Sequence, residues 1–388
     1  MLNICQIHSS YSSNSYSGEN IYVDKLQELL SKYFQCHTLT LSTDSLLRNV
    51  KERYIHGLKY LYTENSFFLR NTKNMDLIIL HNSIPFISRQ TLSALLKNTK
   101  VLKVWHNARP NCIAGGFYRQ SSSCTACLDS KFGKFSSVIN RCYRNSRLQS
   151  AVIQTVEQKM ASLFEHPNMY HLAISEYIKD QIMTFGVSEK KIFSIPNFSQ
   201  KLSVIPEHGK DYLFVGRLDS AKGSAELIKA WSLLTQKERG ERKLHLVGSA
   251  IGQKWSENVQ ELVSNCENGI EVHGELSHAE INLLAFKCRT YVVPSQWEEA
   301  FGNVSIEGLS MGLRLIVTPS GALSSLRGFS GVTVAENKSS LAILAAIRKD
   351  LSSPVLSPLN ISNDWHLNFS SEVIGKKWNS AIHQIVSN

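Results

Sequence analysis

Short apolar runs alternate along the whole chain with longer segments in which apolar residues recur every three or four positions. The short runs have the length of buried strands, and the longer segments, such as Ile21–Tyr33, have the spacing of amphipathic helices. Regular alternation of strand and helix predicts an α/β fold, in which helices cover parallel sheets. The predicted strands are Leu2–Ile7, Cys36–Leu41, Met75–Leu80, Val101–Trp105, His171–Ile174, Lys191–Ile195, Tyr212–Val215, Leu244–Val247, Ile270–Val272, Thr290–Val293, Leu315–Val317 and Val332–Val334.

The strands fall into two groups of six, separated by a stretch in which the apolar periodicity lapses. This stretch, Pro196–Gly209, collects Pro, Ser, Gln and Lys, and a chain of 388 residues is long enough for two cores. We therefore expect an N-terminal Rossmann-like domain over residues 1–198 and a C-terminal one over residues 199–369. The last segment, residues 370–388, reads as a helix that packs back on the N-terminal domain.

The composition is that of an ordinary globular protein, with 43% hydrophobic and 19% charged residues. The N-terminal residues lack the basic and apolar regions of a signal peptide, and we find no apolar stretch of the roughly 20 residues that a membrane span needs. We expect a cytoplasmic protein whose eight cysteines are reduced.

The net charge of +10 is concentrated in the first half of the chain. Residues 1–200 hold 23 Lys and Arg against 13 Asp and Glu, and the excess peaks between Lys100 and Ser150, where Asp129 is the only acid. A basic surface of this kind suits phosphates, whether of nucleic acid, anionic lipid or a diphosphate-linked substrate. A solvated basic face without a partner remains the alternative.

A first candidate site follows the strand that ends at Val215. The segment Gly216-Arg217-Leu218-Asp219-Ser220-Ala221-Lys222-Gly223 leads from this strand into a helix. Arg217 and Lys222 can then point at one site beside a helix N-terminus, which favours anions. Two fixed cations are what a leaving diphosphate needs where no magnesium neutralises it.

A second candidate site follows the strand Thr290–Val293. Glu299 and Glu307 stand eight residues apart, and Gly302 marks the start of the helix that carries Glu307. Glu299 can accept hydrogen bonds from sugar hydroxyls, and Glu307 can accept two from a ribose. The amides at Gly302, Asn303 and Val304 are expected to meet the diphosphate or the sugar.

Together these segments resemble the donor-binding signatures of the retaining GT-B glycosyltransferases of group 1, a family with many enzymes of bacterial cell-surface polysaccharides. The resemblance implies two Rossmann-like domains whose parallel sheets face each other across a cleft. It assigns Arg217 and Lys222 to the donor phosphates, Glu307 to the ribose and Glu299 to the transferred sugar. The positions that match the rest of the family's donor site are Gly216, Gly274, Leu276, Phe301, Gly302, Asn303 and Val304.

The resemblance extends more loosely into the first half. Gly18 matches the family's glycine loop, although Ser17 stands where the family commonly has a second glycine. His106 follows a strand at the place where the family lines the cleft near the transferred sugar, and His81 follows another strand. A polar side chain that merely satisfies its neighbours is the alternative for both histidines.

Four cysteines form a separate group within an insert over residues 107–147: Cys112, Cys124, Cys127 and Cys142. Thiolates in this number, with one C-x2-C pair, suggest a structural zinc site in a reducing compartment. Free, buried cysteines are the alternative, because the outer spacings are irregular.

The resemblance therefore implies a retaining hexosyltransferase that needs no cofactor for catalysis. The implied partners are a nucleotide-sugar donor, a glycan or polyprenyl-diphosphate-linked acceptor and an anionic membrane surface, which would place the protein on the inner face of the membrane. Nucleic acid is not expected, because the basic stretch lacks interleaved aromatic residues. The alternatives are a nucleotide-sugar epimerase on the same fold and a basic zinc- or nucleic-acid-binding protein. A dinucleotide-dependent dehydrogenase is disfavoured, since the first strand is not followed by G-x-G-x-x-G.

Overall fold

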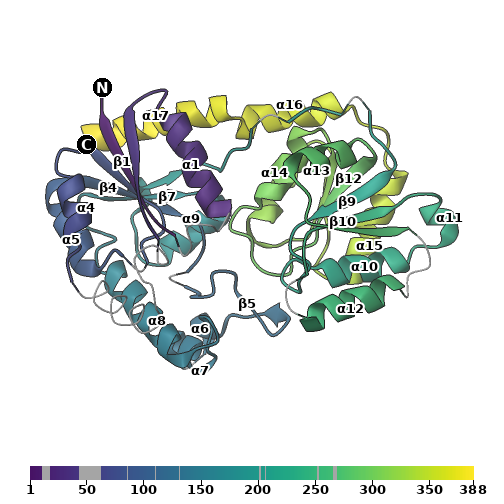
Figure 1. Ribbon diagram of the computed structural model, residues 1–388, viewed down its shortest axis with the longest axis horizontal. Helices are drawn as coiled ribbons and strands as arrows, with labels where there is room; N and C mark the ends of the chain where they lie inside the picture. The colour runs from purple at the N-terminus through teal and green to yellow at the C-terminus, as the bar shows by residue number, and fades with distance from the viewer. Residues whose placement is uncertain are drawn as a thin grey trace. The chain divides into compact units, whose positions relative to one another are not determined.

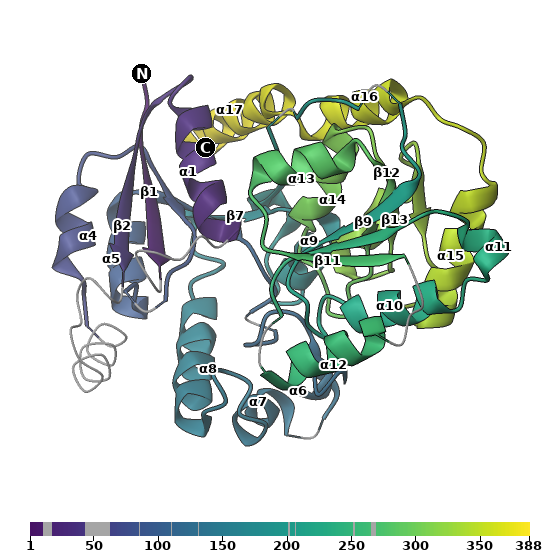
Figure 2. The same ribbon diagram turned by 45° about the vertical axis from the view of Figure 1, so that its right-hand side comes forward.

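The computed structural model describes residues 1–10, 18–42, 63–84, 86–109, 111–130, 132–200, 202–205, 207–250, 253–264 and 269–388. Contacts between its residues divide the chain into two compact units (Figures 1 and 2). The first unit comprises Met1–Gly116, Thr125–Asn197 and Ile374–Asn388, and the second comprises Phe117–Cys124 and Phe198–Val373. The sequence assigned the whole insert to the N-terminal domain, whereas the contacts of Phe117–Cys124 group these residues with the second unit.

A parallel sheet of six strands forms the centre of the first unit. The strand order reverses between β1 and β3, because the chain moves to one side of β1 first and to the other side afterwards. In sheet order the strands are β2 (Gln35–Ser42), β1 (Asn3–Ser10), β3 (Leu77–Leu80), β4 (Lys100–Trp105), β7 (Met169–Ala173) and β8 (Ile192–Ser194).

The helices of the first unit include the last helix of the chain, α17 (Ser371–Ser387), most of which belongs to this unit. Its Trp378 is fully buried, and a Cβ atom added at Gly375 would lie 3.0 Å from the Leu29 side chain of α1. Among the described residues, the other helices of this unit are α1 (Gly18–Leu30), α4 (Ser66–Asn71), α5 (Arg89–Asn98), α6 (Ala126–Asp129), η1 (Gly133–Phe135), α7 (Ser136–Ile139), α8 (Arg147–Ala161), α9 (Glu176–Met183) and η2 (Glu189–Lys191).

The second unit also contains a parallel sheet of six strands, with β11 at one edge. Its order reverses between β9 and β12, as in dinucleotide-binding folds. In sheet order the strands are β11 (Ile270–Gly274), β10 (Leu244–Val247), β9 (Asp211–Val215), β12 (Cys288–Val293), β13 (Arg314–Val317) and β14 (Val332–Val334). A separate hairpin consists of β5 (Tyr118–Arg119) and β6 (Ser122–Ser123).

Helices cover both faces of this second sheet (Figure 1). Successive strand residues alternate between two cores, so that Tyr291 and Val293 lie in one core and Val292 lies in the other. The first core includes residues of α13 (His278–Ala285), α14 (Asn303–Ser310), η3 (Gly321–Leu326) and α16 (Pro358–Phe369). The second includes residues of α10 (Ser224–Ser232), α12 (Gln253–Ser264) and α15 (Ser340–Ser352), and a short α11 (Gln236–Arg239) follows α10.

The predicted α/β class with two parallel sheets is confirmed, and each of the predicted apolar runs lies on a strand. β1 extends to Ser10, three residues beyond the end of the predicted strand Leu2–Ile7. None of the helices in the described part of the chain is both long enough and apolar enough to cross a membrane.

Candidate active site

Two loops of the second unit meet where its strand order reverses. One loop, Gly216–Gly223, follows β9, and the other, Pro294–Gly302, follows β12. The carbonyl oxygen of Ala221 in the first loop accepts hydrogen bonds from the backbone N–H groups of Gln296 and Trp297 in the second, at 2.8 and 3.2 Å. This end of a parallel sheet is where ligands bind in such folds.

Each loop enters its helix through a glycine in the left-handed conformation. Gly223 (φ +74°) is the N-cap of α10 and Gly302 (φ +88°) is the N-cap of α14, and neither helix has a side-chain cap. At Gly223 any side chain is excluded, since a Cβ atom would lie 1.9 Å from the carbonyl oxygen of Pro294. The two helices therefore present first turns that no side chain caps, an arrangement that favours anions.

Lys222 and Glu299 join the two loops through an ion pair. The Lys222 Nζ atom lies 2.7 Å from Glu299 Oε1, and the Ser295 hydroxyl donates to the same oxygen at 2.6 Å. Burial alone would raise the pKa of the Glu299 carboxyl, but the Lys222 ammonium and the hydrogen bonds outweigh it and hold this pKa below its usual value. Glu299 is thus a buried, ionised acceptor.

Arg217 lies beside this pair and is much more accessible, with 46% of its side chain exposed. Its Nε donates to Asp219 Oδ2 at 2.8 Å, while Asp219 Oδ1 accepts from the Lys222 backbone N–H at 2.9 Å. Both cations also contact one indole: Arg217 Cζ and Lys222 Nζ lie 5.5 and 4.6 Å from the centre of the Trp297 ring. Arg217, Lys222 and Glu299 are therefore brought together by the two loops.

The other predicted donor residues of this unit lie on or beside the same loops. Glu307 is half-buried on α14, and Phe301 and Val304 pack against the core beneath it, whereas Asn303 is exposed. Gly216 directly follows β9. Gly274 ends the edge strand β11, which β10 separates from β9, and Leu276 follows this strand.

The first unit has a hollow at the corresponding end of its own sheet. It is lined by residues from the ends of β3 and β4 and from the helices α1 and α8: Glu19, His81, Asn82, Ser83, Lys103, Val104, Trp105, His106, Asn107, Arg109 and Glu157. Gly18 is exposed at the start of α1, next to Glu19, and Ser17 falls outside the described residues. The hollow contains two acids, two cations and two histidines, which suits a polar ligand.

His81 and His106 belong to a hydrogen-bond chain with a defined direction. The Gln6 amide nitrogen faces the backbone carbonyl of Val23, so its Oε1 must accept from His81 Nε2, at 2.8 Å. Burial lowers the pKa of both histidines, which keeps the rings neutral. His81 Nδ1 then accepts a hydrogen bond from His106 Nε2, at 2.9 Å. His106 Nδ1 keeps a lone pair that can accept a hydrogen bond from a ligand hydroxyl.

The comparisons with known proteins agree with this geometry. Residues 197–364 match the family described as Glycosyl transferases group 1. A D-inositol 3-phosphate glycosyltransferase from Pseudarthrobacter chlorophenolicus is 32% identical over 126 residues, a segment that spans 30% of this chain and 30% of that relative.

Two solved structures cover nearly the whole chain. The lipopolysaccharide outer core galactosyltransferase WaaB, in its apo form, superimposes with a TM-score of 0.67 at 17% identity, over 99% of each chain. The Anabaena protein HepE, in complex with UDP and glucose, gives a TM-score of 0.62 at 12% identity, over 99% of this chain and 100% of HepE. The chain has the GT-B fold. The matches also support the resemblance to the group 1 glycosyltransferases.

The four cysteines of the GT-B insert are divided between the two units. None of the four forms a disulfide, and all are half-buried. Cys124 belongs to the second unit, whereas Cys112, Cys127 and Cys142 belong to the first. Within the described residues, one group of three or more potential ligands has its atoms within 4.8 Å of one another, and it contains none of these cysteines. A zinc site at the cysteines stays a prediction.

Several site residues were not predicted from the sequence. Lys103 is buried on β4, and a single charge inside the apolar run Val101–Trp105 could have identified it. Ser295, Trp297 and Asp219 flank the predicted residues in the sequence, but their contacts depend on how the loops after β9 and β12 meet.

Proposed function

We propose that this protein is a retaining glycosyltransferase that binds a nucleotide-diphosphate sugar in its second unit and transfers the sugar to a glycan or a polyprenyl-diphosphate-linked oligosaccharide in surface polysaccharide synthesis. The observation that carries the proposal is the Lys222–Glu299 pair, 2.7 Å apart, beside two helix N-termini without side-chain caps. This combination lies within the segment that matches the group 1 glycosyltransferases.

Lys222 is suited to contact the donor phosphate without leaving Glu299. An ammonium group has three donors, of which Glu299 takes one, so two remain for phosphate oxygens. Arg217 adds a second cation that is more exposed to incoming ligands. Glu299 retains acceptor capacity for a sugar hydroxyl, since a carboxylate offers about four lone-pair positions.

The proposed reaction needs neither a protein nucleophile nor a metal ion at the donor. The bond between the anomeric carbon and the diphosphate oxygen breaks, and a bond to the acceptor oxygen forms on the same face of the sugar. The acceptor's proton passes to the leaving phosphate, whose charge Arg217 and Lys222 stabilise. We assign the acceptor to the hollow of the first unit, where His106 Nδ1 can accept from a hydroxyl.

We infer that the donor is a UDP-linked hexose. Support comes from HepE, which was solved with UDP and glucose, and from WaaB, which is a galactosyltransferase. Both share the fold of this chain, so their ligands are the first donors to examine.

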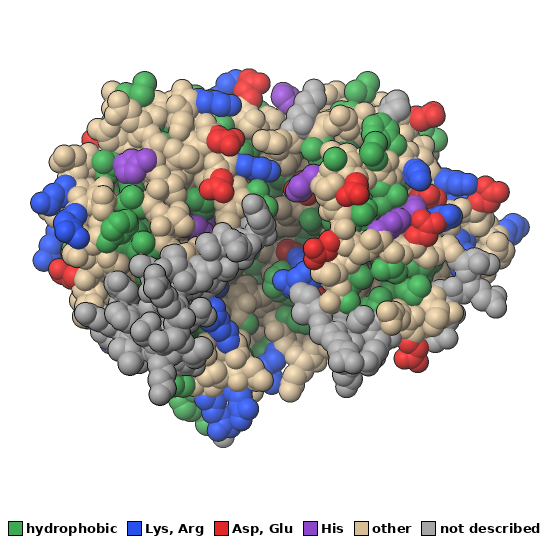
Figure 3. Space-filling model, viewed as in Figure 1, with side chains coloured by type: hydrophobic (Ala, Val, Ile, Leu, Met, Phe, Trp, Pro, Cys, Tyr) green, Lys and Arg blue, Asp and Glu red, His purple; other side chains and the backbone are tan. Residues whose placement is uncertain are grey.

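A surface of the first unit supports the proposed membrane attachment. Phe132 and Phe135 are more than half exposed, and the exposed Arg141, Arg144 and Arg147 follow in the same segment. Apolar and basic side chains lie together at the lower edge of Figure 3, where Figure 1 draws α6, α7 and α8. Exposed aromatic rings with arginines beside them suit an anionic lipid surface.

A panel of nucleotide sugars tests the donor assignment. We expect one or a few UDP-hexoses to raise the melting temperature and to be hydrolysed slowly in the absence of acceptor, with the same rate in EDTA. The control variant Lys229→Ala, changed at an exposed lysine of α10, should behave like the wild type. If no nucleotide sugar at millimolar concentration stabilises the protein or is hydrolysed, the proposed function is wrong.

A further inference from the structure

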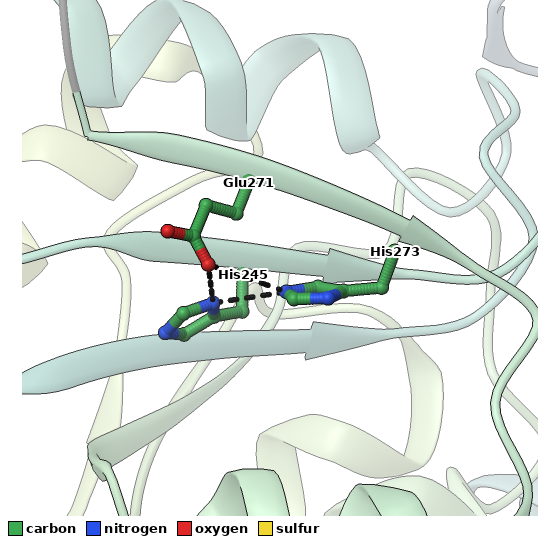
Figure 4. A group of neighbouring side chains, drawn as sticks. All are labelled: His245, Glu271 and His273. Carbon is green, nitrogen blue, oxygen red and sulfur yellow. Dashed lines mark hydrogen bonds and ion pairs between the residues drawn. The ribbon is translucent and has the colours of Figure 1, made fainter.

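Three potential metal ligands converge on the second unit, on strands β10 and β11. His245 Nδ1 lies 3.0 Å from His273 Nε2 and 3.3 Å from Glu271 Oε2, and the last two atoms lie 3.8 Å apart. Figure 4 shows the three side chains pointing toward one another, with His245 on one strand and Glu271 and His273 on its neighbour. The register explains the meeting, because His245 pairs directly with Glu271, and His273 lies two residues further on the same face.

The hydrogen bonds around the group direct lone pairs to its centre. His245 Nε2 faces Asp211 Oδ2 at 3.2 Å, and Asp211 Oδ1 accepts from the Lys243 backbone N–H, so His245 donates through Nε2. With its proton on Nε2, the His245 ring carries a lone pair on Nδ1. This lone pair accepts from His273 Nε2–H when no metal is bound, and zinc would take the place of that proton. Lys243 Nζ binds the other oxygen of Glu271, Oε1, which leaves Oε2 turned inward.

The spacing fits a tetrahedral zinc ion. Bonds of 2.0–2.1 Å at the tetrahedral angle place neighbouring ligand atoms about 3.3–3.4 Å apart, and the three observed separations of 3.0, 3.3 and 3.8 Å surround that value. A carboxylate that accepts from the outer nitrogen of a ligating histidine, as Asp211 does here, is the usual partner of such a ligand. We propose that His245, His273 and Glu271 bind one zinc ion, which is separate from the cysteines of the insert.

The ion would fasten the edge of the sheet. β11 is an edge strand, and its pairing with β10 shifts register at His273, because Leu246 pairs with Val272 and Val247 pairs with Gly274. Three protein ligands leave the fourth position of zinc for water, and His273 and Glu271 are 26% and 40% exposed on that strand. The role is structural and does not depend on the proposed glycosyl transfer.

Zinc binding by the whole protein tests the site, after dialysis against a chelator and then against buffer. We expect about one equivalent of zinc to bind at these residues and to raise the melting temperature. His273→Gln and Glu271→Gln should each weaken that binding more than about 100-fold, and Asp211→Asn about 10- to 100-fold. His278→Gln, which changes an exposed histidine of α13 outside the group, should bind like the wild type.

Cobalt distinguishes this site from a thiolate site. In the Cys124→Ser/Cys127→Ser variant we expect cobalt to give visible bands without thiolate charge transfer, and these bands should disappear in His273→Gln. The proposal is overturned if the double cysteine variant binds no metal, or if His273→Gln and Glu271→Gln bind it as tightly as the wild type. Because folding is monitored by melting in every variant, a lost site can be told from an unfolded protein.

Discussion

Lys222 serves two purposes that make different demands on it. It neutralises the buried Glu299, and it is the cation proposed to meet the donor phosphate. A buried carboxylate that loses its partner is costly, so a simple truncation would mix lost stability with lost turnover. The two effects can be separated, because the Glu299 charge can be removed as well.

We predict that Lys222→Ala lowers both stability and turnover, and that Glu299→Gln added to it restores stability alone. Losing a charge-assisted contact to the leaving phosphate should cost roughly 3 kcal/mol in the transition state, about a hundredfold in rate. Melting temperature and steady-state kinetics of the two variants, beside Lys229→Ala, measure this. Turnover that recovers along with stability would contradict the proposed role of Lys222.

His171 is a buried base whose two nitrogens are both occupied. Its Nδ1 accepts from the Trp105 indole at 3.0 Å, and its Nε2 lies 3.0 Å from the Phe164 carbonyl oxygen, to which it donates. Burial lowers its pKa to about 4, with smaller contributions in the same direction from Lys103 and Lys191. The folded protein therefore keeps His171 neutral at pH values at which the unfolded chain protonates it.

We predict that His171→Gln reduces the loss of stability in acid. Above about pH 6.5 neither the folded nor the unfolded state binds the proton. As the pH falls from about 6.5 to about 4, only the unfolded state binds it. The free energy of unfolding therefore drops by up to about 1.4 kcal/mol per pH unit. The variant lacks this contribution, so it should be less stable than the wild type at pH 7, with a gap that narrows in acid. Urea unfolding between pH 7 and pH 4.5 measures the gap, and a constant difference would contradict the assignment.

At the scale of elements, the loops depend on backbone approaches that exclude side chains. Gly223 is the clearest example, because its conformation and its distance from Pro294 both require glycine. Gly274 has a similar φ of +69° but nothing within 4 Å of an added Cβ atom, which makes it a matched control in the same unit.

We predict that Gly223→Ala destabilises the second unit by clearly more than Gly274→Ala. The left-handed conformation costs an alanine about 1–2 kcal/mol at either position, whereas at Gly223 the loop after β12 must also move. Thermal melting measures the difference in stability between the two variants, and melting of Gly223→Ala with donor should show that donor stabilisation is lost. Equal melting temperatures for the two variants would show that the contact with Pro294 is unimportant.

The strands of the two large sheets could be predicted from the sequence, because each contains a short apolar run. The placement of Arg217, Lys222 and Glu299 in loops after such runs could also be predicted, whereas their role in donor binding stays a prediction. Contacts between strands could not be predicted from the sequence. His245 and Glu271 are neighbours only because β10 and β11 pair in one particular register, which periodicity does not determine. Lys103 was missed for a similar reason, since the hollow around it combines residues from β3, β4, α1 and α8.

At the scale of the whole molecule, part of the positive charge excess of the first half lies on the surface between α6 and α8. Exposed arginines and exposed phenylalanines occupy the same stretch between α6 and α8. Total charge was readable from the sequence, but the exposure of Phe132 and Phe135 was not, because an aromatic residue in a short apolar segment is more often buried.

We predict sedimentation with anionic liposomes at low salt, and release as salt rises. Each arginine near the surface contributes about 1 kcal/mol, a contribution that ions screen. Phe132→Ser/Phe135→Ser should weaken the binding at all salt concentrations, whereas Arg141→Ser/Arg144→Ser should reduce its dependence on salt. Phe67→Ser, at an exposed phenylalanine of α4, is the control. Equal recovery with neutral liposomes would contradict the proposed attachment.

The return of α17 to the first unit has a consequence for synthesis on the ribosome. The second unit, whose sequence ends at Val373, emerges with all its strands and helices before Trp378 is available to the first unit. The unit that is translated first is therefore completed last, in reverse of the usual order in which N-terminal domains fold first. Until α17 arrives, the apolar surface around Leu29 that faces Gly375 stays uncovered, and a nascent chain at that stage is one that chaperones and proteases would recognise.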